Sequence, residues 1–231
     1  MTNAILMASG LGTRLRPLTE STPKPLVEVH GKPMIETIIE SLQKVKVEKI
    51  YIVVGYLAEK FNYLEQKYSN IKLIFNPDYN IANNISSIYY ACDKLKQADC
   101  FICEADLYIS DTNILCPLPL YSGYYGKMVS GETQDWVFDI DSNGYITRIG
   151  KHGTNCFNMV GLSYFTRQDT SIIAESIKEF YLQEKYKNLF WDDVVDRNLD
   201  KLKLKIHPVK SSQIIEIDTL EELNNVLKNK K

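Results

Sequence analysis

The segment that decides the fold is residues 8–17, ASGLGTRLRP, together with residues 22–25, TPKP. It directly follows an apolar run at residues 3–7, which we predict to be a buried strand. A dinucleotide-binding loop would require a third glycine where Leu15 stands, and a P-loop would require Gly-Lys-Ser/Thr where this chain has Gly-Thr-Arg. The segment therefore matches neither of these two phosphate loops.

The chemistry of this segment nevertheless favours phosphate binding. Gly10 and Gly12 let backbone N–H groups approach a polyphosphate without a Cβ atom in the way. The glycines alone would fit an ordinary strand-to-helix turn equally well. Arg14 can add a bidentate contact, and Lys24, which lies between two prolines, supplies a second cation. The two cations favour a phosphate site over a plain turn.

Strand and helix patterns alternate through the first half of the chain. The patterns predict strands over residues 3–7, 49–54, 72–75 and 100–105 and helices over residues 33–44, 57–68 and 85–95. This alternation predicts an α/β fold with a Rossmann-like, mostly parallel sheet and helices on both faces. Such sheets bind ligands at the carboxyl ends of their strands, so we expect the site in the loops that follow the strands.

The second half of the chain changes character. Residues 127–131, 136–140 and 145–149 are predicted to be short antiparallel strands, which would form a small insertion that binds an acceptor. Further helices are predicted over residues 169–185 and 191–198, and further strands over residues 202–207 and 213–217. Asp218 is predicted to open a last helix, with Glu221 three residues on. Residues 1–231 show no repeat and no linker, so we expect one domain.

Composition excludes several classes of protein. The 231 residues carry 27 basic and 29 acidic side chains, a net charge of -2, so no overall field attracts nucleic acid. The chain has no apolar run long enough to span a bilayer and no signal peptide at its start, so we expect a cytoplasmic protein without membrane insertion. The cysteines are expected to be reduced apolar fillers, with Cys100 and Cys103 on opposite faces of a strand; the full set is Cys92, Cys100, Cys103, Cys116 and Cys156.

A strand followed by G-x-G-T-R-x-x-P-x-T and then P-K-P resembles the nucleotidyltransferase family that joins NTPs to sugar phosphates and related phosphomonoesters. The resemblance implies that Arg14 holds the triphosphate and that Lys24 steadies the α-phosphate as pyrophosphate leaves. It also implies that the first loop contacts the nucleotide through Ala8, Gly10, Leu11, Gly12 and Thr13.

Carboxylates at two strand ends indicate a metal site. Asp106 follows the predicted buried strand, and Glu216 and Asp218 alternate onto one face of another. Magnesium prefers hard oxygens, usually one or two carboxylates completed by phosphate and water. We therefore predict Mg2+ as the cofactor, held by these three side chains; the resemblance implies the pair Asp106 and Asp218. A helix N-cap is the alternative role for Asp218.

Residues 76–87, NPDYNIANNISS, open the third predicted helix. Asn83 or Asn84 would fit as a helix cap, yet asparagine amides can also donate to the O2 and N3 acceptors of cytosine. The N-N-x-x-S stretch, which ends at Ser87, resembles bacterial CTP:phosphocholine cytidylyltransferases. That resemblance covers nearly the whole chain, including Gly55 and Tyr56, which it implies are nucleotide-binding together with the asparagines and the serine.

Two tryptophans indicate the acceptor. Trp136 and Trp191 each adjoin acidic residues, Asp135 and Asp192 respectively. Indoles are most often buried in cores, but an aromatic face beside a carboxylate also recognises a quaternary ammonium by cation-π attraction. Phosphocholine would require such a site, so we predict that Trp136, Trp191 and Asp192 bind the acceptor. Lys151 follows a predicted strand and is expected to be solvent-exposed.

The resulting hypothesis is attack by a phosphocholine oxygen on the α-phosphorus of CTP, in line with departing pyrophosphate. A phosphomonoester is already mostly a dianion at pH 7, so no general base is required. The Gln-Asp pair at residues 134–135 differs from the Asn-Glu pair of the family, which leaves an aminoalkyl phosphonate or an amino-acid phosphate open as the acceptor. A sugar-1-phosphate nucleotidyltransferase and a catalytically silent binding module are further alternatives, and the oligomeric state is left open.

Overall fold

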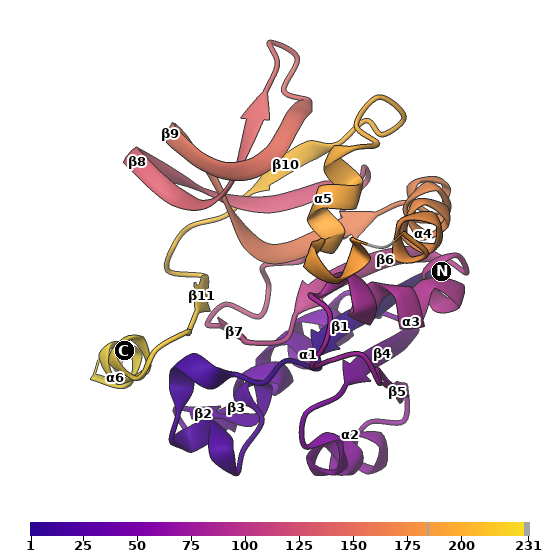
Figure 1. Cartoon of the computed structure of the whole chain (residues 1–231). Helices are drawn as coiled ribbons and strands as arrows, with labels where there is room; N and C mark the ends of the chain where they lie inside the picture. Colours follow the sequence, from indigo (N-terminus) through magenta and orange to yellow (C-terminus); the bar gives the residue numbers. More distant parts are fainter. Residues whose placement is uncertain (184, 229–231) are drawn as a thin grey trace.

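The computed structural model describes residues 1–183 and 185–228. Within them, a seven-stranded sheet has the order β10-β8-β9-β6-β1-β4-β5 (Figure 1). Its strands are β1 (Thr2–Ala8), β4 (Lys49–Val54), β5 (Ile71–Phe75), β6 (Asp99–Glu104), β8 (Gly123–Ile140), β9 (Ile146–Phe165) and β10 (Lys205–Pro208). β5, β4, β1 and β6 run parallel, whereas β9 is antiparallel to β6 and to β8. The predicted Rossmann-like, mostly parallel sheet is confirmed.

Helices cover both faces of the parallel part of the sheet. On one face, α1 packs Ile35, Ile38, Ile39 and Leu42 into the core, a spacing that places all four on one side of a helix. On the other face, side chains of α3, α4 and α5 form a second buried cluster. The helices are α1 (Met34–Lys44), α2 (Asn62–Lys67), α3 (Ile85–Leu95), α4 (Arg167–Tyr181), α5 (Trp191–Asp196) and α6 (Leu220–Lys228).

The predicted antiparallel insertion is larger than expected. The two strands predicted over residues 127–131 and 136–140 are parts of one strand, β8, and β9 continues far beyond residue 149. Residues 150–155 are polar or glycine, so they lack the alternation that predicts a strand. Several register shifts interrupt the β8–β9 pairing, as bulges do where paired strands bend. The ribbon thus rises away from the parallel strands (Figure 1).

The C-terminal segment returns to the edge of the site. β11 (Ile214–Glu216) pairs with β7 (Leu107–Ile109), directly after β6. The last helix is capped one residue later than predicted: Thr219 Oγ1 accepts from the backbone N–H of Glu222, whose carboxylate accepts from the N–H of Thr219. Because this pair replaces Asp218 and Glu221 in the capping box, the carboxylate of Asp218 remains available to the site.

Smaller differences concern element ends and short elements. The helix predicted over residues 57–68 is split into a 3-10 turn and α2. The helix predicted over residues 169–185 corresponds to α4, which ends at Tyr181. Residue 184 of that predicted span and residues 229–231 lie outside the described residues. The remaining elements are β2 (Glu28–Val29), β3 (Lys32–Pro33) and 3-10 turns at Thr13–Leu15, Leu18–Glu20, Lys24–Leu26, Ala58–Phe61 and Tyr186–Asn188. None of the described helices is long and apolar enough to cross a membrane.

The cysteines follow the prediction in part. Cys103 and Cys100 belong to the two core clusters on opposite faces of the sheet, and burial raises the pKa of each thiol well above its usual range. Cys92 is also buried, as expected for an apolar filler. Cys116 is exposed, so the prediction is wrong for that residue. Its loop carries no periodic pattern from which burial could have been judged.

Candidate active site

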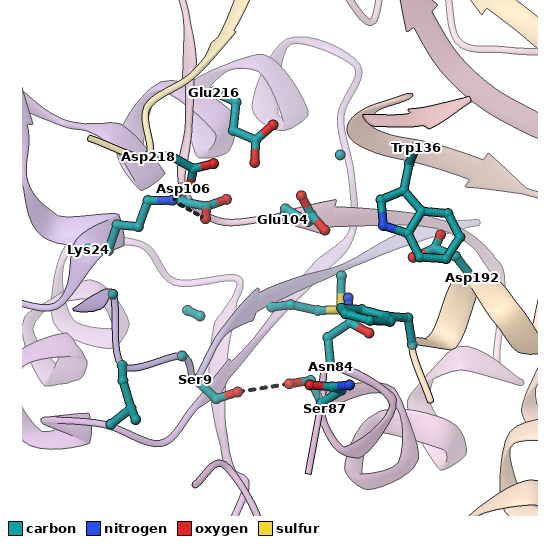
Figure 2. A pocket seen from close by; sticks show the side chains of 18 of the residues that line it. Ser9, Lys24, Asn84, Ser87, Glu104, Asp106, Trp136, Asp192, Glu216 and Asp218 are labelled. Carbon is teal, nitrogen blue, oxygen red and sulfur yellow. Dashed lines mark hydrogen bonds and ion pairs between the residues drawn. The ribbon is translucent and has the colours of Figure 1, made fainter. Parts of the chain in front are cut away.

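A cavity of about 670 Å3 lies between the carboxyl ends of β1 and β6 and the β8–β9 ribbon. A volume of this size suits a small-molecule site. The cavity brings together most of the residues predicted from the sequence (Figure 2). Those that line it are Ala8, Gly10, Leu11, Gly12, Thr13, Arg14, Lys24, Asn83, Asn84, Ser87, Asp106, Trp136, Asp192, Glu216 and Asp218.

The glycine-rich loop takes a shape that requires glycine at one position. Gly12 has φ +62°, in the left-handed region, and a Cβ atom there would lie 2.9 Å from Lys24 Cβ. Its carbonyl accepts a hydrogen bond from Thr19 Oγ1 at 2.8 Å. A Cβ atom on Gly10 would meet nothing within 4 Å. The loop is therefore braced against the next segment at Gly12 and left open to the cavity at Gly10.

The two predicted cations meet two of the predicted carboxylates. Lys24 Nζ lies 2.7 Å from Asp106 Oδ2 and also contacts Asp218 Oδ1, which in turn lies 2.8 Å from an Arg14 nitrogen. Lys24 is only 7% exposed. Burial alone would lower the pKa of this lysine, but the attraction of Asp106 and Asp218 outweighs burial, and the pKa is raised. The ammonium group therefore stays charged at the floor of the cavity.

Two further acidic residues, Glu216 and Glu104, line the cavity beside this pair. Partial desolvation at the cavity wall, together with repulsion from Asp106 and Asp218, raises the pKa of Glu216 to about 7. Burial also raises the pKa of Glu104 well above its usual range, with Asp106 and Glu216 adding to the effect. Gly161 makes room for Glu104, since a Cβ atom there would lie 2.7 Å from Glu104 Oε2. Glu104 was not among the predicted site residues, although its spacing of two residues from Asp106 places both side chains on one face of a strand.

The predicted magnesium site can be tested against these carboxylates. Asp106 Oδ1 is buried and has no hydrogen-bond partner within the described residues, so one hard oxygen is available to a cation. The same residues contain no group of three His, Cys, Asp or Glu side chains that could hold a metal ion together. The predicted set of three carboxylates is therefore not brought together, but Asp106 and Asp218 fit a magnesium ion that phosphate and water complete, and its binding here stays a prediction.

A buried polar network joins the phosphate loop to the start of α3. Ser9 Oγ and Ser87 Oγ are 2.8 Å apart, as the dashed line in Figure 2 shows. Asn76, which is fully buried, donates from Nδ2 to Ser86 Oγ at 2.9 Å and more weakly to the other two hydroxyls. Asn76 Oδ1 accepts from the N–H of Asp78. Asn76 thus positions both segments, a role that the sequence analysis did not assign.

The asparagines at the start of α3 do not cap the helix with their side chains. Asn83 Nδ2 donates to the carbonyl of Asn188 at 2.9 Å, and Asn84 Oδ1 accepts from the N–H of Trp191 at 3.0 Å. These bonds tie the helix start to the segment before α5. Asn84 Nδ2 makes no hydrogen bond within the described residues, so it can donate to a base in the cavity, and this role stays a prediction.

The prediction for Gly55 and Tyr56 requires correction. Neither residue lines the cavity. The N–H of Tyr56 donates to the carbonyl of Ser9 at 3.1 Å, and its hydroxyl donates to the carbonyl of Thr19 at 3.0 Å. A Cβ atom on Gly55 would lie 2.9 Å from the Ser9 carbonyl oxygen. Both residues support the phosphate loop from behind, because β4 ends beside β1 and its last turn packs under the loop.

The acceptor end contains one of the two predicted indoles. Trp136 lines the cavity and meets Phe190 edge to face, with ring centroids 5.6 Å apart. Trp191 does not: it is 3% exposed and its ring stacks on Tyr124 at 5.7 Å in the core. The reason is local, since Phe190 precedes α5 in extended conformation whereas Trp191 begins the helix with its side chain on the core face. The aromatic residue beside Trp136 is therefore Phe190, one position before the predicted one.

The corrected positions predict opposite effects for the two tryptophans. Trp191→Ala is expected to lower the free energy of unfolding by about 3–5 kcal/mol, because it removes a large buried side chain. Trp136→Ala is expected to leave stability nearly unchanged and to raise the KM for the acceptor. Urea denaturation of both variants, combined with steady-state kinetics, checks this. Equal losses of stability would contradict the placement of Trp136 in the cavity.

A buried carboxylate, that of Asp192, lines the same cavity as the Trp136 indole (Figure 2). Asp192 is 3% exposed, and its Oδ1 has no hydrogen-bond partner in the described part of the chain. Burial raises the pKa of Asp192 to about 7, an effect that the Tyr124 hydroxyl partly offsets and that Asp193 increases. A cationic group entering the cavity would satisfy this carboxylate.

A phosphate loop, a buried lysine and paired carboxylates at the carboxyl edge of a parallel sheet are the parts of a nucleotide-transfer site. Residues 3–116 match the family described as Nucleotidyl transferase. The chain is 53% identical over 222 residues to the 2-aminoethylphosphonate cytidylyltransferase of Lancefieldella rimae, covering 96% of this chain and 90% of that protein. It is 34% identical over 227 residues to the choline-phosphate cytidylyltransferase of Haemophilus influenzae, covering 97% and 96%.

The fold comparison agrees. The solved structure of the CTP:phosphocholine cytidylyltransferase of Streptococcus pneumoniae superposes with a TM-score of 0.90 at 32% identity, covering 98% of each chain. The chain belongs to the nucleotidyltransferase family, within its group of bacterial cytidylyltransferases.

Proposed function

We propose that this cytidylyltransferase transfers the cytidylyl group of CTP to 2-aminoethylphosphonate, releasing pyrophosphate. The observation that carries the choice of acceptor is the buried Asp192 carboxylate with its unpartnered oxygen, beside a cavity wall that holds one indole rather than two. The similarity to the Lancefieldella rimae protein supports the same acceptor.

The quaternary ammonium of phosphocholine and the primary ammonium of 2-aminoethylphosphonate require different binding groups. A quaternary ammonium has no N–H groups and is recognised by several aromatic faces. A primary ammonium carries three N–H donors, which require oxygen acceptors when they leave water. Asp192 offers such an acceptor, and Asp135 and Gln134 also line the cavity. These polar groups favour a primary amine.

Phosphocholine, the acceptor that the sequence analysis favoured, is the second candidate. The Trp136–Phe190 pair supports it, because its two ring faces lie at the acceptor end of the cavity. The similarity to the Haemophilus influenzae and Streptococcus pneumoniae proteins supports it as well. A sugar phosphate is disfavoured, since the aromatic pair stands where sugar hydroxyls would need polar partners.

In the proposed reaction, a phosphonate oxygen of the acceptor attacks the α-phosphorus of CTP. The new P–O bond forms as the bond to the pyrophosphate oxygen breaks, and the electron pair leaves with pyrophosphate. Arg14 and Lys24 stabilise charge on the phosphates, and Asn84 orients the base, so catalysis consists of positioning and charge neutralisation. Asp106 and Asp218 would hold magnesium, which when bound supplies further positive charge to the triphosphate.

The test is pyrophosphate release measured over a grid of four NTPs and four acceptors: 2-aminoethylphosphonate, phosphocholine, phosphoethanolamine and glucose-1-phosphate. We expect the highest kcat/KM for CTP with 2-aminoethylphosphonate, and turnover that requires magnesium. A higher kcat/KM for phosphocholine would overturn the choice of acceptor. Turnover with UTP or TTP and glucose-1-phosphate alone would overturn the cytidylyltransferase itself.

A further inference from the structure

The ammonium group of Lys151 lies over both aromatic rings that line the cavity, those of Trp136 and Phe190. Its Nζ lies 5.9 Å from the centroid of the Trp136 ring and 5.7 Å from that of Phe190. Lys151 is exposed, as the sequence predicted, yet it lines the cavity. In the β8–β9 ribbon it is the direct cross-strand partner of Trp136, so both side chains project from the same face.

The backbone that carries Lys151 is held in place from the same strand. Arg148 donates to the carbonyl oxygens of Lys151 and His152, at 3.3 and 3.2 Å. Arg148 is itself fixed by two bonds to Asp139, at 2.6 and 3.0 Å. His152 adopts φ +67°, so the chain bends directly after Lys151. The backbone from which the Lys151 side chain projects is therefore braced.

We propose that Lys151 determines acceptor specificity: its ammonium occupies the Trp136–Phe190 pair and so disfavours acceptors that carry a quaternary ammonium. This inference rests on the proposed function for the two acceptor classes that it compares. A second cation on the same ring faces would be repelled by the lysine. A primary ammonium avoids this conflict because its N–H groups can bond the carboxylate of Asp192 instead.

The role of Lys151 can be tested by removing its cation. Lys151→Ala is expected to raise the ratio of kcat/KM for phosphocholine to kcat/KM for 2-aminoethylphosphonate by about tenfold, since one ring-face cation site is then vacated. Lys151→Arg keeps a cation that stacks on aromatic rings and is expected to leave the ratio near that of the unmodified protein. Lys94→Ala is the matched control, because Lys94 lies over the Tyr51 ring at 5.8 Å, outside the cavity.

A binding measurement separates this inference from the proposed function, because it requires no turnover. Tetramethylammonium chloride is titrated against tryptophan fluorescence, with Trp136→Phe removing the reporter in the cavity. We expect the Kd for tetramethylammonium to be about tenfold lower for Lys151→Ala than for the unmodified protein. Equal Kd values, or no binding to either protein, would overturn the role of Lys151. Absence of turnover with 2-aminoethylphosphonate would overturn the proposed function. The titration would still test the role of Lys151 in that case.

Discussion

Lys24→Gln is expected to lower kcat/KM for CTP by about 100-fold to 1000-fold, the loss that follows removal of one group that stabilises transition-state charge. Lys24 is the cation at the cavity floor, and its ammonium contacts Asp106 and Asp218. Glutamine preserves the polarity and most of the length of the side chain but not its charge. Pyrophosphate release at several CTP concentrations gives the measurement.

The same substitution is expected to reduce stability, because it leaves two partly buried carboxylates without their cation. Breaking a buried ion pair from one side costs about 3–5 kcal/mol, and part of that cost depends on how far Asp106 and Asp218 remain hydrated. The double variant Lys24→Gln, Asp218→Asn removes one of the two charges and is expected to recover thermal stability without recovering turnover. Circular dichroism establishes that both variants fold. Near-normal kcat/KM in a folded Lys24→Gln protein would contradict the role of this lysine.

Asp192→Asn is expected to raise the KM for 2-aminoethylphosphonate by roughly 30-fold or more, with little change in the KM for CTP. Truncating or neutralising one partner of a buried charge pair costs about 2–5 kcal/mol of binding. The matched control is Asp200→Asn, which neutralises an exposed carboxylate near the same helix. Equal effects of the two substitutions, or a KM change confined to CTP, would contradict the placement of the acceptor ammonium.

The pH dependence of Asp192 has a defined sign. Burial, with the adjacent Asp193 adding to it, raises the pKa of Asp192 from its usual 3.8 to about 7. The folded protein therefore binds more protons than the unfolded chain between these values, and the contribution of Asp192 to stability falls as pH rises through this window. The acceptor needs the ionised form, so its KM should fall as pH rises through about 7. In Asp192→Asn, the pH dependence of stability and the pH dependence of the acceptor KM should both be reduced. Denaturation and steady-state kinetics between pH 5 and 9 measure the two.

The sequence predicted the parallel sheet and the position of the glycine-rich loop at its edge well, because both depend on local patterns. An apolar strand, the glycines at residues 10 and 12, and the cation at residue 14 lie within one short segment, so their proximity needs no long-range information. Lys24 and Asp106 converge because successive parallel strands end at the same edge of the sheet. The alternation of Glu216 and Asp218 likewise placed both in the cavity.

The wrong predictions concern pairs of adjacent residues whose side chains point in different directions. Trp191 and Phe190 are adjacent, and the start of α5 sends one into the core and the other into the cavity. Thr219, rather than Asp218, caps the last helix for a similar reason. Composition and periodicity place an element within a few residues, whereas the direction of a side chain at its first turn depends on the tertiary packing of that element.

The hydrogen-bonded serines beneath the cavity have a consequence for how a nucleotide is received. Since Asn76 joins Ser9 of the glycine-rich loop to Ser87 of α3, the two segments that we propose bind the triphosphate and the base are held at a set separation before any ligand arrives. Little conformational entropy then has to be lost when both ends of the nucleotide bind. Cytidine or inorganic triphosphate, each of which reaches only one of the two segments, would meet a surface already in its final shape. The covalent link between base and triphosphate in CTP would therefore add affinity largely without a change in the protein's conformation.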